Sequence, residues 1–219
     1  MKKSRLAGGI LALALLSTAG VSKEFSVGLT AGTIGMGAEA ATSITENLNV
    51  RTVVAGFKYS KDGAQGTDIT YEGDAEFLNA GLLLDYYPFG SGIRLSAGGY
   101  YNGTSVALKG VPAAGSSYTF NGVTYTSADV GDLNAEVKYK KIMPYVGFGF
   151  GNTMAGGNFT FGMDIGAMIG SPTASLTVTN PTNNAILAAN AAVEEQKLKD
   201  EIGNLPVYPV VTVSASYRF

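Results

Sequence analysis

Six charged residues stand at alternating positions within segments that otherwise carry small, aromatic or aliphatic side chains. Three are acids and three are bases: Glu39, Arg51, Asp85, Arg94, Asp164 and Arg218. Carboxylates and guanidinium groups that are enclosed together form short, charge-assisted hydrogen bonds, and a buried charge without its partner is costly. The set therefore predicts a salt-bridged polar core, shared with Tyr87, Tyr100 and Tyr145. The alternative is a gate that opens a narrow pore when the ion pairs exchange partners.

The residue types that most enzymes use are missing. The chain has no His and no Cys, which removes the usual general base, the commonest metal ligand, any disulfide and any thiol chemistry. Acids crowd at Asp62, Asp68, Glu72, Asp74 and Glu76, and their oxygens suit Ca²⁺ or Mg²⁺, but the spacing fits no EF-hand loop. We interpret this cluster as a solvated edge. We therefore expect a protein that is not an enzyme, with no catalytic residue, no cofactor and no metal site.

The six charges lie in segments whose apolar residues recur at every second position, which is the period of a β-strand. In residues 159–169 every odd position is apolar, and Asp164 stands among the even ones. The same pattern occupies residues 78–86, 93–101, 142–150 and 211–219. Each segment has 9 to 11 residues, about the length that a tilted strand needs to cross the hydrocarbon layer.

Short and long connections alternate along the chain. The short ones are residues 45–47, 88–92 and 152–158, and the long ones are residues 61–68, 110–132 and 180–206. Transmembrane barrels have short periplasmic turns and longer external loops. The sequence therefore predicts an all-β fold, an antiparallel up-and-down transmembrane β-barrel with short periplasmic turns and long extracellular loops.

Closure of the barrel sets the number of strands. If residues 24–44 form one strand there are seven, and the first and last strands would then meet in parallel. Splitting this segment at residues 33–36 gives eight antiparallel strands, with both chain ends on the periplasmic side. Ten strands result if a hairpin at Asn121-Gly122 joins the wall, since Asn-Gly between β-formers favours a type I′ turn.

The last long connection contains a predicted helix over residues 185–202. Glu195 and Lys199 are spaced as an i,i+4 pair, and Gly203 stands where a helix C-cap is expected. We expect this helix to lie on the mouth of the barrel. The alternative is that it forms a partial plug or a partner site.

Residues 1–22 read as a cleaved signal peptide, which leaves residues 23–219 as the barrel domain. Lys2, Lys3 and Arg5 precede an apolar run from Leu6 to Leu16, which is too short to span a membrane as a helix. Without these three bases, 12 of the 15 basic residues remain against 17 acidic ones, a net charge of −5. This charge argues against nucleic acid as a partner.

The C-terminal residues 213–219, Val-Ser-Ala-Ser-Tyr-Arg-Phe, resemble the signal by which the outer-membrane assembly machinery captures its barrels. Alternating apolar residues lead to a terminal aromatic: Val213, Ala215, Tyr217 and Phe219. With the signal peptide and the segment Pro144-Tyr-Val-Gly-Phe-Gly, the mature chain resembles the small eight-stranded barrels of the OmpA, OmpX and OmpW type. The absence of Trp departs from the usual aromatic girdles.

The resemblance implies the outer membrane of a Gram-negative bacterium, with outer-membrane lipid, lipopolysaccharide and the barrel assembly machinery as partners, and a monomer. We expect a non-enzymatic barrel that serves envelope integrity or surface interaction through its extracellular loops. One alternative, which the OmpW resemblance implies, is a narrow channel or lateral port for small or hydrophobic solutes. Another is a soluble barrel with its apolar face inside, against which the C-terminal signal and the sorted loop lengths argue.

Overall fold

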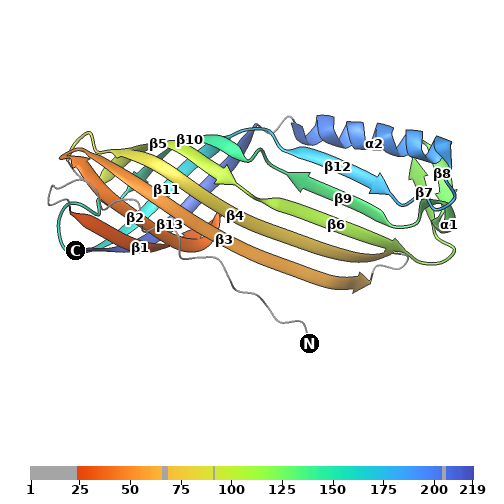
Figure 1. Ribbon diagram of the computed structural model, residues 1–219, viewed down its shortest axis with the longest axis horizontal. Helices are drawn as coiled ribbons and strands as arrows, with labels where there is room; N and C mark the ends of the chain where they lie inside the picture. The colour runs from red at the N-terminus through yellow and green to blue at the C-terminus, as the bar shows by residue number, and fades with distance from the viewer. Residues whose placement is uncertain (1–23, 66–68, 91, 204–205) are drawn as a thin grey trace.

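The computed structural model describes residues 24–65, 69–90, 92–203 and 206–219, and the predicted signal peptide lies outside them. These residues form thirteen β-strands and two helices, and the paired strands are antiparallel throughout. The prediction of an all-β, antiparallel fold is therefore confirmed (Figure 1).

Eight of the strands pair in succession, and the last pairs with the first, so that their pairings form a ring. In ring order they are β1 (Phe25–Gly32), β2 (Gly35–Thr45), β3 (Leu48–Gln65), β4 (Ile69–Tyr86), β5 (Ile93–Asn102), β10 (Ile142–Phe150), β11 (Phe159–Ile169) and β13 (Val207–Arg218). The β2–β3 and β10–β11 connections and the C-terminus lie at one end of this ring, and the β1–β2 turn lies at the other end (Figure 1).

Alternation decides which way the side chains of the ring point. Along β13 the side chain of Val213 is 57% exposed, whereas its neighbour Thr212 is 5% exposed. In the same way Phe161 on β11 lies outside and Asp164 lies inside. The outer surface is therefore apolar, and the charged side chains of these strands are enclosed, which is the reverse of a soluble barrel.

The first hairpin of the ring lies where closure required a split. β1 ends at Gly32 and β2 begins at Gly35, and Gly35 has a positive φ of 105° that a residue with a side chain rarely adopts. The hairpin tip is held from inside by two hydrogen bonds to backbone carbonyls. The Asn79 amide donates to Ile34 (3.0 Å) and the Tyr208 hydroxyl donates to Thr33 (2.6 Å).

An extension continues from one end of the ring. β3 and β4 run past their ring partners, and three further strands add to β4 in turn: β6 (Ser105–Pro112), β9 (Leu133–Lys138) and β12 (Thr173–Val178). The prediction of a loop over residues 61–68 was therefore wrong for most of its length, because β3 reaches Gln65 and β4 starts at Ile69. Backbone pairing continues here without the apolar period that the prediction relied on.

The predicted hairpin at Asn121-Gly122 forms, but outside the ring. β7 (Ser117–Phe120) and β8 (Val123–Thr126) pair only with each other, as a separate two-stranded sheet. The positive φ angles of Asn121 (49°) and Gly122 (79°) are those of a type I′ turn. The short helix α1 (Ser127–Val130) follows, with Thr126 and Asp129 in a capping box. The hairpin therefore adds no strand to the wall of the ring.

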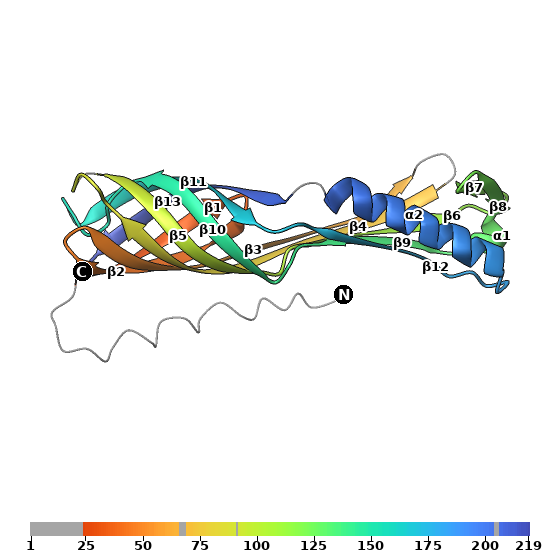
Figure 2. The same cartoon turned by 90° about the horizontal axis from the view of Figure 1, so that it is seen from above.

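The long helix α2 (Ala185–Gly203) matches the predicted range, but it lies along β12 and not on the ring (Figure 2). It begins where the Asn184 side chain accepts hydrogen bonds from the backbone N–H groups of Ile186 and Leu187. Both expected positions, on the mouth and as a plug, are therefore wrong. Among the residues described, no helix is long and apolar enough to cross a membrane.

Leu187 and Ala191 of α2 are buried in a cluster with Phe120, Tyr125 and Val130. This contact explains the position of α2, because the hairpin and the edge of the extension together cover the apolar side of the helix.

Candidate functional site: the filled interior of the ring

Five strands deliver one charge each to the interior of the ring. Glu39 comes from β2, Arg51 from β3, Asp85 from β4, Arg94 from β5 and Asp164 from β11, and each is at most 5% exposed. Their inward direction follows from strand parity. The residues on either side of each charge face outward and are nearly all apolar, so the charge itself faces the interior. The register then brings them to a similar depth. Gly149 of β10 pairs with Arg94 on one side and with Asp164 on the other, and Asp85 pairs with Asn49, two residues before Arg51.

Arg51 is the centre of this charge network. Its guanidinium group binds Asp85 through Nε (2.7 Å) and Nη2 (3.1 Å). It binds both oxygens of Asp164 at 3.1 Å and lies 3.5 Å from Glu39. One buried cation thus serves three carboxylates from three other strands, which joins opposite sides of the ring.

Arg94 completes the network from the other side of Asp164. Its Nη2 lies 2.7 Å and its Nε 3.2 Å from the two carboxylate oxygens. The remaining nitrogen, Nη1, donates to the backbone carbonyl of Gly151. Gly149 makes room for this pair, because a Cβ there would lie 2.7 Å from the Asp164 carboxylate and 2.9 Å from Arg94 Nε.

Hydroxyl groups add further partners to two of the carboxylates. Ser96 donates to Asp85 Oδ1 (2.5 Å), which Arg51 also binds, and Ser216 donates to Glu39 Oε1 (2.8 Å), which Arg51 leaves free. Buried carboxylates need such partners, since an unbound ionic oxygen would carry its full desolvation cost. Two arginines and three carboxylates give the network a formal charge of −1.

Arg218, the sixth residue of the predicted set, is not part of this network. It stands at the end of β13 and binds Glu24 at 3.0 Å, together with the carbonyls of Met154 (2.8 Å) and Gly156 (2.7 Å). Strand parity predicted correctly that Arg218 is on the inward face of β13. It carries no information on the position along the barrel axis, and the end of β13 lies level with the turns. The grouping of Arg218 with the other five charges was therefore wrong.

A second, apolar layer fills the ring above the charges, on the side of the extension. It was not predicted from the sequence, and it consists of these residues: Ile34, Val53, Ala55, Leu83, Tyr100, Met143, Tyr145, Met168, Tyr208 and Val210. Met143 and Met168 are fully buried. The rings of Tyr100 and Tyr145 meet edge to face at 5.3 Å between centroids, so these two tyrosines belong mainly to the apolar layer.

Glycines set the shape of this layer. A Cβ at Gly166 would lie 2.5 Å from the Tyr145 hydroxyl oxygen, and one at Gly81 would lie 2.5 Å from the Tyr100 ring. The missing side chains therefore provide the volume in which the two rings pack across the interior. Tyr87, the third tyrosine of the expected network, donates to the Gly151 carbonyl (3.4 Å).

Three residues of the predicted assembly signal lie on the outer face of β13, and the fourth, Phe219, directly follows the strand. Val213, Tyr217 and Phe219 are between 44% and 76% exposed, and Ala215 is half-buried. The ring of Phe219 stacks on Phe25 of β1, with centroids 6.3 Å apart. β13 is also the strand that pairs with β1 and so completes the ring.

No group of three or more His, Cys, Asp or Glu residues that could hold a metal ion is present in the described part of the chain. Asp85 and Asp164, the two acids closest to Arg51, are both neutralised by guanidinium contacts. The arrangement suits a fixed interior that resists separation of the strands.

Comparisons with known proteins identify the fold. No protein-family model matches the sequence, and no curated protein matches it. The crystal structure of Acinetobacter baumannii CarO is similar, with a TM-score of 0.57 and 20% identity over 89% of this chain and 97% of that one. That of Acinetobacter baumannii CarO2 gives 0.58 and 20% over 90% and 98%. A major outer membrane protein from Thermus thermophilus reaches a TM-score of 0.42, too low to bear on the fold. At such identities, the likeness to the CarO structures shows that this chain shares their fold.

Proposed function

We propose that this protein is a closed, non-enzymatic barrel of the Gram-negative outer membrane that holds its extension at the cell surface. It would serve envelope integrity or surface interaction, with the extension as the interacting part. The observation that carries the proposal is the filled interior. A charged layer around Arg51 and an apolar layer around Tyr145 lie one above the other inside the same ring.

The outer surface of the ring supports placement in lipid. Leu82 on β4, Phe161 on β11 and Val213 on β13 are 57% to 71% exposed, and a soluble protein rarely presents such a continuous apolar belt to water. The short turns, on the side of the C-terminus, would face the periplasm and the extension would face outward, as in other bacterial barrels. An eight-stranded ring is just wide enough for its side chains to fill it.

A narrow channel remains the competing function. It would require Arg51 to release Asp85 or Asp164 and the apolar layer to part at the same time. Each buried pair would then lose its partner at a cost of about 3–5 kcal/mol. We therefore favour the closed barrel, and lipopolysaccharide and other lipids as the partners of its wall.

Site-directed labelling tests the membrane placement, because the chain has no Cys of its own. Ala114, in the turn after β6, and Ala155, in the turn between β10 and β11, are both exposed. With a membrane-impermeant maleimide, Ala114→Cys should react on intact cells, and Ala155→Cys should react only after the outer membrane is permeabilised. Equal labelling of the two variants on intact cells, or the reverse order, would contradict the proposal.

A further inference from the structure

The exposed apolar residues of β3 and β4 switch from the outer face to the inner face of the sheet at the level where the ring ends and the extension begins. On the outer face of β3 and β4 the apolar belt ends at Leu78, and the next outward pair is Lys58 and Glu76, whose charged groups lie 3.8 Å apart. On the inner face the uncovered apolar residues begin at that same height with Phe57 of β3 and Phe77 of β4, which pair with each other. Their ring centroids are 6.4 Å apart.

The inner face of the extension continues this apolar surface away from the ring. Tyr59 lies opposite Ala75, which lies opposite Val106, and Leu108 follows on the same face of β6. These side chains are uncovered, with Tyr59 at 54%, Leu108 at 50% and Val106 at 40% exposure. α2 covers the far part of the same face, where Leu133 of β9 and Leu176 of β12 pack against the cluster that contains Leu187.

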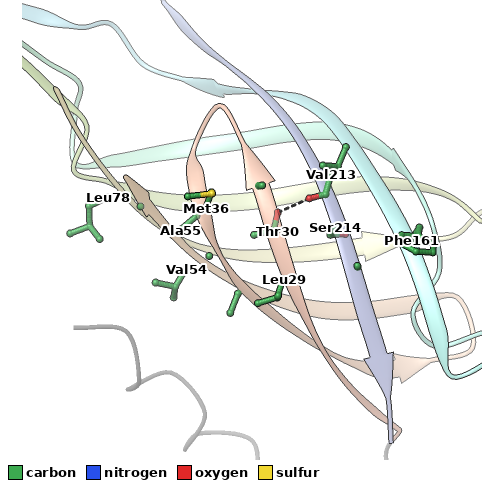
Figure 3. A pocket seen from close by; sticks show the side chains of 14 residues that line it. Leu29, Thr30, Met36, Val54, Ala55, Leu78, Phe161, Val213 and Ser214 are labelled. Carbon is green, nitrogen blue, oxygen red and sulfur yellow. Dashed lines mark hydrogen bonds between the residues drawn. The ribbon is translucent and has the colours of Figure 1, made fainter. Parts of the chain in front are cut away.

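The short β1–β2 hairpin lets the two apolar surfaces meet. The neighbouring strands β3 and β13 extend beyond the hairpin tip. β2 pairs with β3 only up to Gly56, and β1 pairs with β13 only up to Thr212. Below the tip, a depression of about 830 Å³ lies in the outer wall between Leu29, Val54 and Val213. Figure 3 shows Met36 near the hairpin tip, with Leu78 and Val54 on one side and Val213 on the other.

A second depression, of about 390 Å³, continues over the tip. Gly32, Gly35 and Met36 line it from the hairpin, and Phe57 and Phe77 line it from the extension. Met36 is 64% exposed and lines both depressions. An apolar path therefore runs from the outer wall, round the hairpin tip and onto the inner face of the extension.

We propose that the inner face of β3, β4 and β6 binds an acyl chain of an outer-leaflet lipid, which reaches it round the tip of the β1–β2 hairpin. This inference rests on the proposed function, since the ring must sit in lipid for the lower depression to meet acyl chains. The occupant follows from continuity, because the path begins at the lipid-facing wall and is lined mainly by apolar residues. A lipid chain that stays outside the ring leaves the filled interior intact.

The absence of Trp from the sequence provides a clean test. The refolded mature chain is placed in nanodiscs of phosphatidylcholine with brominated acyl chains, which quench Trp fluorescence on contact. Phe57→Trp puts the reporter on the proposed binding face. Lys58→Trp puts it at the same height on the opposite face, and Leu82→Trp puts it on the outer wall as a reference. Tyr59→Trp serves as a second reporter of the binding face if Phe57→Trp does not fold.

We expect fractional quenching in Phe57→Trp at least twice that in Lys58→Trp, and strong quenching in Leu82→Trp. Adding Met36→Gln should at least halve the quenching of Phe57→Trp and leave that of Leu82→Trp unchanged. If Leu82→Trp is quenched but Phe57→Trp is quenched no more than Lys58→Trp, the acyl-chain site is wrong and the membrane placement stands. If Leu82→Trp is not quenched, the ring is not in lipid, and the proposed function fails together with the inference.

Discussion

Replacing Arg51 with Met should destabilise the ring more than any other single loss of positive charge. The substitution keeps a long side chain but removes the cation that Glu39, Asp85 and Asp164 share. Asp164 would still have Arg94, whereas Asp85 and Glu39 would each keep one hydroxyl partner. Removing one partner of a buried ion pair costs about 3–5 kcal/mol.

Urea unfolding of the protein in lipid vesicles measures this effect. With a denaturant slope of about 2 kcal/mol per M, the midpoint should fall by about 1.5–2.5 M. Arg94→Ala should cost less, about 1.5–3 kcal/mol, because Asp164 would keep its two bonds to Arg51.

The matched control is Lys58→Met, which removes a cation from an ion pair that is more than half exposed on both sides. Exposed pairs contribute about 1 kcal/mol or less, so its midpoint should barely move. A midpoint for Arg51→Met that falls no further than that of Lys58→Met would refute the charge network as the support of the ring.

Three further predictions concern the apolar contacts, the glycines and the extension. Leu187→Ala should release α2 and expose it to protease while the ring resists, because Leu187 is fully buried and its neighbour Ile186 is 67% exposed; Ile186→Ala is the control. Gly98→Ala should cost about 1–3 kcal/mol, since its Cβ would overlap a carbonyl of β4, whereas Gly99→Ala, with its nearest neighbour at 3.8 Å, should change the urea midpoint little. The pKa of Glu194 lies below its ordinary value, because hydrogen bonds from a lysine and from the β7–β8 turn favour the carboxylate. Protonation weakens these hydrogen bonds, so docking of that turn should weaken as the pH falls through the carboxyl range. The measurement is the amide protection factor at the turn, corrected for the slower intrinsic exchange at low pH; it should fall with pH, and a Glu194→Gln variant should show the lower value already at neutral pH.

The ring strands were predictable because each of their side chains points either to the outer face or to the interior of the ring. In residues 159–169 an apolar side chain faces outward and Asp164 faces inward, so the period of two is unbroken. The same constraint placed the charges of β3, β4 and β5 inside, even where residues 48–60 alternate poorly. Closure then located the first hairpin, for which the local sequence carries little signal.

Features that depend on depth or on register were not predictable in this way. Parity could not show that Arg218 lies level with the turns. It placed Met143 inside, but the apolar layer that Met143 shares with Tyr145 and Met168 depends on the pairing of β10 with β11, which sets Tyr145 opposite Met168. The helical period over residues 185–202 showed that a helix forms there and not which surface it covers.

Electrical recording across a planar lipid bilayer tests the central claim most directly. The purified chain from residue 23 onward, shown to be folded by its heat-dependent mobility on gels, is inserted into the bilayer, and current is recorded at a range of voltages. A ring filled by the Arg51 network and the Tyr145 layer should give no unitary conductance steps. Stable, reproducible steps from the folded protein, absent from a preparation that was boiled, would show that the interior opens and would contradict the closed barrel.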